Sequence, residues 1–305
     1  GAPLRFGTSG IRGPLGAGPA RMNRAVVRRL TTGIAAWLDP RSTVVLARDA
    51  RRMSDVFAAD IESVLDLSGH TCVSLPDPVP TPVLAFAVRH LSADAGLMVT
   101  ASHNPPGDNG VKVFAADGAQ IVSPHDAAIS ASMVATPRPD RLASPPAPPA
   151  PPAPPARVSA GEGDHGLVVA YVDALGSVLG RTPEGPGRRD LPPIVIAYTA
   201  LHGVAASITA QAFARVPYVH LDSLARECRP DPSFGGLASP NPESAEAMDG
   251  VIRHAVQVGA VLAIAHDPDG DRLGVAVPRP GTSGGTPAHW TSLSGDQIGA
   301  LLADH

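Results

Sequence analysis

Short apolar runs alternate with amphipathic stretches over the first hundred residues. The runs 43–47 and 95–100 are apolar and contain β-branched residues, which is typical of buried strands. The pattern predicts a strand at 43–47, a helix at 54–67, a strand at 72–75, a helix at 83–90 and a strand at 95–100. Strands that alternate with helices indicate an α/β unit with a largely parallel sheet.

The same alternation returns in the second half of the chain. It predicts a strand at 191–198, a helix at 204–215, a strand at 216–221, a helix at 242–258, a strand at 260–265 and a return strand at 275–277. Residues 293–305 have the apolar face of a further helix, and too few residues follow to complete a domain around it. We therefore expect the chain to be truncated.

A proline-rich segment separates the two halves. It contains PPAPPAPPAPPA and almost no large apolar residue, so it cannot bury a core and is expected to be an extended spacer. A ligand for an SH3-type partner is the alternative, but nothing else in the chain indicates signalling. We predict two consecutive α/β domains with mixed, largely parallel sheets flanked by helices, plus the start of a third. The expected boundaries are 1–136, a linker or inserted loop at 137–165, a second domain at 166–278 and the third from 279 to 305.

Composition excludes several classes of protein. The formal charge is −4, so there is no basic excess to indicate a nucleic-acid surface. No apolar stretch approaches the roughly 20 residues that span a bilayer, so no membrane partner is expected. Cys72 and Cys228 lie far apart and form neither a disulfide framework nor a metal pair. A reduced, cytoplasmic compartment is the simplest interpretation.

The segment TASHNPPGDNGVKVF, residues 100–114, carries the first candidate chemistry. Ser102 directly follows a predicted strand, which places its hydroxyl at the carboxyl edge of the sheet, where α/β proteins bind ligands. The glycines of a hydrolase elbow are missing around it. A catalytic triad built on Ser102 and His103 is not expected, because neighbouring side chains project apart. The alternative is a loop whose polar residues only cap turns.

The segment HDPDGDRLGVAV, residues 266–277, contains the second set of candidate functional residues. Asp267, Asp269 and Asp271 occupy alternate positions of a near-extended loop, so their carboxylates can converge on one cation. Oxygen ligands suit magnesium or calcium rather than zinc. An EF-hand is excluded, because Gly270 stands at loop position four and Pro278 at position twelve. A solvated acidic turn is the alternative, weakened by the apolar strand that precedes it.

Other motifs are less specific. RFGTSGIRG, residues 5–13, offers hydroxyls and backbone N–H groups to a phosphate, but alone it is better explained as a tight turn. Lys112 is the only lysine among 24 basic residues and lies ten positions after Ser102. An amine can exchange a proton where a guanidinium cannot. YTALHG (198–203) and SPNPE (239–243) receive no chemical role.

Together and in this order, these segments resemble the α-D-phosphohexomutase superfamily, which includes bacterial phosphoglucomutases and phosphomannomutases. The resemblance rests on the serine loop TASHNPPGDNGVK (100–112), the DPDGDR loop, TALHG, SPNPE and the terminal SGDQIGALLADH. The last three motifs are most similar to the phosphoglucomutase and phosphomannomutase subgroup, which also contains phosphopentomutase-like members. The resemblance implies four domains, of which we expect this chain to contain the first two and the start of the third. The expected activity is intramolecular phosphoryl transfer between the 1- and 6-positions of a glucose or mannose phosphate.

The resemblance implies a role for each candidate residue. Ser102 would be the phosphoserine, and Mg²⁺ would be held by Asp267, Asp269, Asp271 and a phosphoryl oxygen on Ser102. Lys112 is our choice of general acid and base, with His103 as its rival or helper. The phosphate contacts would be Thr8, Ser9, Arg12 and Arg272, and Arg12 would also be a catalytic residue.

Three alternatives stay open. Because the sugar-reading and phosphate-gripping loops are missing, the chain could be a catalytically incompetent remnant. It could also be a phosphopentomutase. A metal-dependent phosphatase is disfavoured, since the Asp267 loop lacks DxDxT.

The partners expected are a small sugar phosphate and a sugar 1,6-bisphosphate, which serves as intermediate and activator. The oligomeric state does not follow from the sequence.

Overall fold

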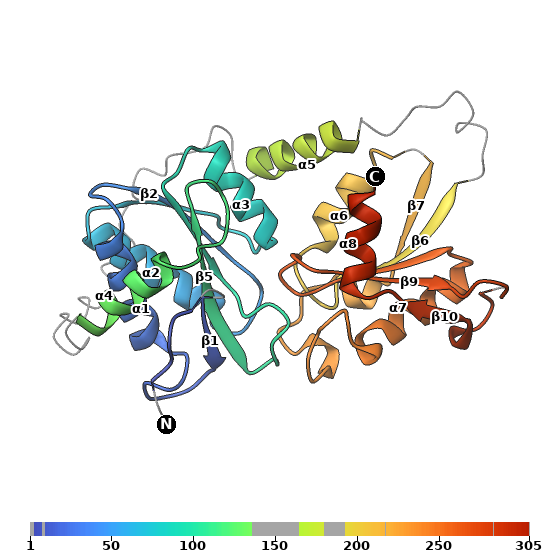
Figure 1. Cartoon of the computed structure of the whole chain (residues 1–305), viewed down its shortest axis with the longest axis horizontal. Coiled ribbons are helices and arrows are strands. Elements are labelled where there is room, and N and C mark those ends of the chain that lie inside the picture. The colour runs from blue at the N-terminus through green and yellow to red at the C-terminus, as the bar shows by residue number, and fades with distance from the viewer. Residues whose placement is uncertain are drawn as a thin grey trace. The chain divides into compact units, whose positions relative to one another are not determined.

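The computed structural model describes residues 3–7, 10–135, 165–179, 193–216, 218–282 and 284–304. They divide between two compact units, one within Gly1–Ala101 and Gly107–Leu167 and the other within Ser102–Pro106 and Val168–His305. In its described residues each unit contains a five-stranded mixed sheet flanked by helices, so the predicted α/β class is confirmed (Figure 1). The predicted linker lies, apart from His165, outside the described residues. Within the described ranges, no helix is long and apolar enough to cross a membrane.

The first sheet has the strand order β1-β5-β4-β2-β3. Its strands are β1 (Ile11–Pro14), β2 (Thr43–Arg48), β3 (Thr71–Ser74), β4 (Ala95–Val99) and β5 (Asp108–Ala115), and its helices are α1 (Arg24–Trp37), α2 (Ser54–Leu67), α3 (Thr81–His90) and α4 (His125–Ala135). β2 pairs in parallel with β3 and β4, whereas β5 pairs antiparallel with β4 and β1. The antiparallel β5 brings Lys112 opposite Met98, next to the strand end that leads to Ser102.

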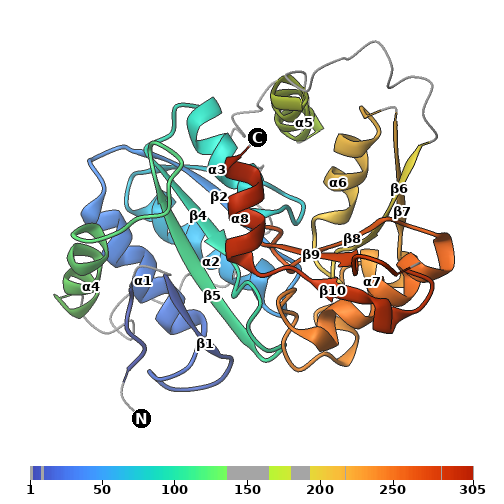
Figure 2. The same cartoon turned by 45° about the vertical axis from the view of Figure 1, so that its right-hand side comes forward.

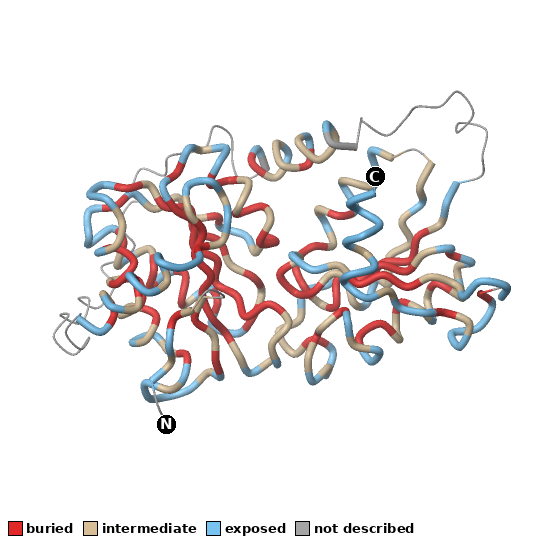
Figure 3. The backbone as a smooth tube through the Cα atoms, viewed as in Figure 1, coloured by how far each residue is buried: buried red, intermediate tan, exposed pale blue. Residues whose placement is uncertain are grey.

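Strand alternation assigns the core of this unit to two faces. Residues on one face, including Val44, Leu46 and Leu97, pack with apolar side chains of α1, α2 and α4. On the opposite face α3 approaches the sheet closely, because a Cβ atom at Gly96 would lie 2.6 Å from Val88 Cγ2. Lys112 alternates with Val111 and Val113 and therefore lies on this second face. Figure 3 shows burial concentrated along the central strands.

Most of the predicted elements of this unit are present, and four were missed. α2 has the predicted bounds, and α3 begins at Thr81 because Pro82 fits the first turn of a helix instead of stiffening a loop. The sequence reading missed α1, α4, β1 and β5. The apolar pattern does not predict β5, since Asn109, Gly110 and Lys112 interrupt it.

The second sheet has the order β10-β9-β8-β6-β7. Its strands are β6 (Ile194–Thr199), β7 (Val219–Ser223), β8 (Leu262–His266), β9 (Leu273–Pro278) and β10 (Trp290–Ser292). The helices of this half of the chain are α5 (His165–Leu179), α6 (Ala206–Phe213), α7 (Ala245–Val258) and α8 (Gly295–Ala303). β8 pairs in parallel with β6 and antiparallel with β9 (Figure 2). The hairpin between β8 and β9 contains the acidic loop.

Two helices cover opposite faces of the second sheet. Ala197, Ala263 and Ala265 pack with α7, whereas Ile196, Tyr198 and Ile264 pack with residues of α6 and its surroundings. α7 starts at Ala245, later than predicted, because the Ser244 side chain accepts a hydrogen bond from Ala247 N as its N-cap. α8 starts in the same way at a capping box on Ser294. Small alanines on the α7 face permit close packing of helix and sheet.

Candidate functional site

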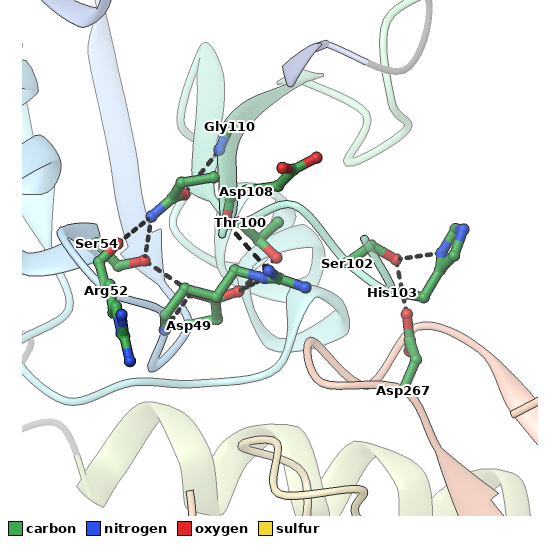
Figure 4. A network of polar contacts seen from close by, with 11 residues as sticks. Asp49, Arg52, Ser54, Thr100, Ser102, His103, Asp108, Gly110 and Asp267 are labelled. Carbon is green, nitrogen blue, oxygen red and sulfur yellow. Dashed lines mark hydrogen bonds and ion pairs between the residues drawn. The ribbon is translucent and has the colours of Figure 1, made fainter. Parts of the chain in front are cut away.

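Ser102 is a buried serine in a strained backbone conformation. It follows β4 by three positions, is 1% exposed and has φ +53°. A serine in the left-handed region costs free energy that the surroundings must offset, which is typical of functional sites. Its hydroxyl donates a 2.7 Å hydrogen bond to Asp267 Oδ2 (Figure 4). The segment Ser102–Pro106 belongs to the second unit, so this contact joins two loops of one compact body.

His103 also contacts the serine. Ser102 Oγ lies 3.2 Å from His103 Nδ1, so the expectation that these neighbouring side chains project apart is wrong. The left-handed φ of Ser102 turns the backbone between them and allows the contact. The backbone of His103 is held as well, because its carbonyl accepts a 2.7 Å hydrogen bond from Ser239 Oγ. SPNPE therefore supports the serine loop, a role that the sequence reading did not find.

The three aspartates converge as predicted. Oxygen atoms of Asp267, Asp269 and Asp271 all lie within 4.8 Å of one another, with the first two buried and the third exposed. The loop is a turn rather than near-extended, because Gly270 has φ +66° and its N–H donates to Asp267 O. The N–H groups of Asp271 and Arg272 donate to Asp267 Oδ1 at 3.1 and 3.0 Å. With the Ser102 hydroxyl on Oδ2, both carboxylate oxygens of Asp267 are thus fixed.

The charges of this cluster oppose one another. Burial, and next the carboxylates of Asp269 and Asp271, raise the pKa of Asp267 well above its usual value, and the Ser102 hydrogen bond acts in the opposite direction. A divalent cation would neutralise this repulsion. The donor set of three carboxylates and a hydroxyl is all oxygen, which fits Mg²⁺ or Ca²⁺. The residues present therefore fit a hard cation.

A second polar network orders the strand end before Ser102. Asp49 follows β2, is 1% exposed, and its Oδ2 accepts a 2.6 Å hydrogen bond from Thr100 Oγ1. Asp49 Oδ1 accepts from Ser54 Oγ at 2.7 Å and from Arg51 N at 2.9 Å. Burial raises the pKa of Asp49, against the opposing effects of Arg51 and Thr100. These contacts, drawn in Figure 4, fix Thr100 two positions before the serine.

Asn109 extends this network to the start of β5. Its Nδ2 donates to Arg52 O at 2.8 Å and to Ser54 Oγ at 3.0 Å. Its Oδ1 accepts from Gly110 N, and Gly110 O in turn accepts from Thr100 N at 3.0 Å. The sequence reading missed Asp49 and Asn109. The signal available for Asp49 was its place directly after the apolar strand β2, whereas Asn109 lies inside β5 and has no such signal.

The other candidate residues divide between the two units. In the first, Lys112 is buried at 2% exposure, and Arg12 pairs with Gly110 across β1 and β5. Arg12 Nε is buried and has no hydrogen-bond partner among the described residues. Arg272, in the second unit, has an exposed side chain. Thr8 and Ser9 lie outside the described residues, between Gly7 and Gly10, whose backbones bond to each other. The catalytic and phosphate-binding roles of these residues stay predictions.

Comparison with known proteins gives consistent matches. Residues 3–138 match the model for phosphoglucomutase/phosphomannomutase α/β/α domain I, and residues 170–282 match domain II. Phosphoglucomutase from Staphylococcus aureus strain MRSA252 is 32% identical over 99% of this chain and 52% of its own length. The chain thus spans about half the length of the curated relatives it matches.

Solved structures agree with these matches. A crystal structure from Thermus thermophilus, assigned as a phosphomannomutase, is 28% identical, has a TM-score of 0.68, and aligns over 90% of this chain and 57% of its own. A phosphoglucomutase/phosphomannomutase family protein from Burkholderia thailandensis has a TM-score of 0.64 at 24% identity and shares the fold. It aligns over 89% of this chain and 54% of its own.

Proposed function

The chain belongs to the phosphoglucomutase/phosphomannomutase family, and we propose that it supplies the phosphoserine and the metal loop of a phosphohexose mutase. The observation that supports this most directly is the 2.7 Å hydrogen bond from Ser102 Oγ to Asp267 Oδ2, beside two further aspartates. A hydroxyl held against a cation-binding carboxylate cluster suits phosphoryl transfer. The substrate class we propose is a hexose monophosphate of the glucose or mannose type.

The reaction would proceed by two transfers through Ser102. In the first, the bond between phosphorus and Ser102 Oγ breaks, and a bond forms to a hydroxyl oxygen of the sugar monophosphate. The hydroxyl proton passes to a base, and the product is a sugar bisphosphate. In the second, the other phosphoryl group returns to Ser102 Oγ, and the base returns its proton to the sugar oxygen. The net change moves phosphate between the 1- and 6-positions.

We assign the proton transfers to Lys112, with His103 as the alternative. Lys112 is a buried amine, and an amine can release and regain a proton more readily than any of the arginines of this chain. His103 Nδ1 lies 3.2 Å from Ser102 Oγ, so it can orient the serine hydroxyl. Arg12 and Arg272 are the proposed contacts to phosphoryl oxygens, together with Thr8 and Ser9.

The cation we propose is Mg²⁺, bound by Asp267, Asp269, Asp271 and an oxygen on Ser102. When bound, it supplies charge neutralisation for the phosphoryl group. Hydrogen bonds within the chain orient the proposed metal ligand Asp267 and order the backbone before Ser102. The turn amides of Asp271 and Arg272 orient Asp267, and the Asp49–Thr100 contact orders the backbone that leads to the serine.

Product analysis tests the proposal. The chain, its Ser102→Ala variant and a Ser68→Ala control are incubated with Mg²⁺ and a sugar 1,6-bisphosphate, and the products are followed by phosphorus NMR. The proposal predicts sugar monophosphate equal in amount to phosphorylated protein, in the wild type and the control alone. Steady release of inorganic phosphate would instead support the metal-dependent phosphatase and contradict the mutase.

A further inference from the structure

The loop between β6 and α6 lies directly against the acidic turn. A Cβ atom at Gly203 would overlap the backbone of Pro268, at 2.7 Å from its carbonyl carbon and closer still to its Cα and oxygen. The next residue, Val204, donates its N–H to Pro268 O at 3.0 Å. Pro268 stands between Asp267 and Asp269, so this loop contacts the backbone that carries two of the three carboxylates.

The same loop has an unusual backbone. Leu201 and His202 are consecutive non-glycine residues with φ +46° and +59°. Non-glycine residues rarely adopt the left-handed backbone conformation, so two such residues in succession must be stabilised by contacts with their surroundings. The tight turn that results, closed by Gly203 N to Ala200 O at 2.7 Å, brings Gly203 to the acidic turn.

Two residues outside this turn hold it in place. Thr199 is fully buried, and its Oγ1 accepts a 3.0 Å hydrogen bond from Leu201 N. The same hydroxyl donates to Glu227 Oε2 at 2.8 Å. The backbone carbonyl of Glu227 accepts the N–H of His202 at 2.7 Å. The amide of Leu201 therefore donates to Thr199, and the amide of His202 donates to Glu227.

We propose that the Thr199–Val204 loop, anchored by Glu227, positions the acidic turn for its divalent cation. Thr199, Gly203 and Glu227 are positioning residues, because they act through Pro268 and bind no cation themselves. The inference rests on the proposed function in so far as that function assigns a cation to the aspartates. It gives a role to the TALHG segment. It also explains why residue 203 is a glycine although its φ is one that other residues adopt.

Cation binding by the full 305-residue chain tests this. Mn²⁺ serves as the probe, and its free fraction is read from the electron paramagnetic resonance signal. Gly203→Ala inserts a methyl group against Pro268, and Gly299→Ala, in α8 with no atom within 4 Å of the added Cβ, is its matched control. Thr199→Val removes the hydroxyl, and Thr199→Ser restores it. Thermal midpoints measured without metal show whether each variant folds.

We expect Gly203→Ala and Thr199→Val to raise the Kd for Mn²⁺ by about 10- to 100-fold, the range for residues that orient metal ligands. Gly299→Ala is expected to match the wild type, and Thr199→Ser to restore most of the binding. If Gly203→Ala fails to fold, the comparison of Thr199→Val with Thr199→Ser tests the inference.

Two results would overturn the inference alone. One is wild-type Mn²⁺ affinity in folded Thr199→Val, and the other is an equal loss in Thr199→Ser, which would indicate a general structural role. Absence of Mn²⁺ binding by the wild type, with Asp269→Asn indistinguishable from it, would contradict the cation assigned under the proposed function as well. The two failures are therefore distinguishable.

Discussion

Ser102 Oγ lies 2.7 Å from Asp267 Oδ2, although the two residues are 165 positions apart in the chain. The contact places a serine hydroxyl directly beside a cluster of three carboxylates. Burial and the neighbouring aspartates raise the pKa of Asp267. The arrangement therefore opposes stability in the absence of a cation and favours binding of one.

Addition of Mg²⁺ is expected to raise the thermal midpoint of the wild type. A ligand that binds the folded state alone stabilises it by about 2.7 kcal/mol at a hundred times its Kd. Asp269→Asn should lose this stabilisation, because it removes one of the three carboxylates. Asp304→Asn, at the end of α8 and outside the cluster, is the control and should retain it. A Mg²⁺-induced shift that persists in Asp269→Asn would contradict the site.

Removal of the Thr100 hydroxyl is expected to destabilise the first unit. Thr100→Val removes the 2.6 Å donor to Asp49 Oδ2 and leaves Arg51 Nε 3.4 Å from that oxygen, and loss of a donor to a buried polar group costs about 1–3 kcal/mol. Thr100→Ser keeps the donor and should recover most of the loss. Urea unfolding followed by circular dichroism measures the difference. Equal unfolding free energies for the valine and serine variants would refute the role given to this contact.

Lys112→Arg keeps the positive charge but replaces an ammonium that can release a proton by a guanidinium that stays protonated. If Lys112 is the general acid and base, transfer of a phosphoryl group from a sugar 1,6-bisphosphate to the protein should slow by about 10²–10⁴-fold. Single-turnover quench experiments measure this rate. Arg253→Lys, on the exposed side of α7, is the control for exchange of basic residues and should not change it. Near-normal transfer in Lys112→Arg would move the role to His103.

The two thiols are expected to react slowly in the native protein. Burial raises the pKa of both Cys72 and Cys228, with smaller contributions from nearby carboxylates such as Glu62 and Glu227. A raised pKa leaves less reactive thiolate near pH 8 than in free cysteine, whose pKa is about 8.5. Reaction with a chromogenic disulfide should therefore be slower than for free cysteine and should accelerate in urea. Fast reaction of both thiols in the native protein would contradict the burial of Cys72 and Cys228.

Periodicity predicted α2 and the strands β2, β4 and β8, but it did not lead to α1, although α1 buries residues at helical spacing. The strands that carry Ser102 and Asp267 were found because each is a short apolar run that ends in polar residues. β5 was missed because the polar residues Asn109 and Lys112 interrupt its apolar pattern, one on each face of the strand. The buried Asn109 is satisfied by hydrogen bonds to Arg52 and Ser54, which are distant in sequence.

Tertiary contacts explain what the sequence could not predict in the site. Ser102 and His103 meet only because Ser102 adopts a positive φ, which no local pattern indicates for a serine. The contact of Asp49 with Thr100 links residues 51 positions apart. Gly203 is required by the approach of Pro268, which becomes visible only when β6 and β8 are side by side.

Phosphorylation of Ser102 by a sugar bisphosphate would identify this serine as the phosphoryl acceptor. The wild-type chain is incubated with radiolabelled glucose 1,6-bisphosphate and Mg²⁺, and the labelled peptide is mapped by mass spectrometry. We expect one phosphoryl group per chain on Ser102, the same label in Ser68→Ala and none in Ser102→Ala. Stoichiometric labelling that persists in Ser102→Ala would show that another residue accepts the phosphoryl group.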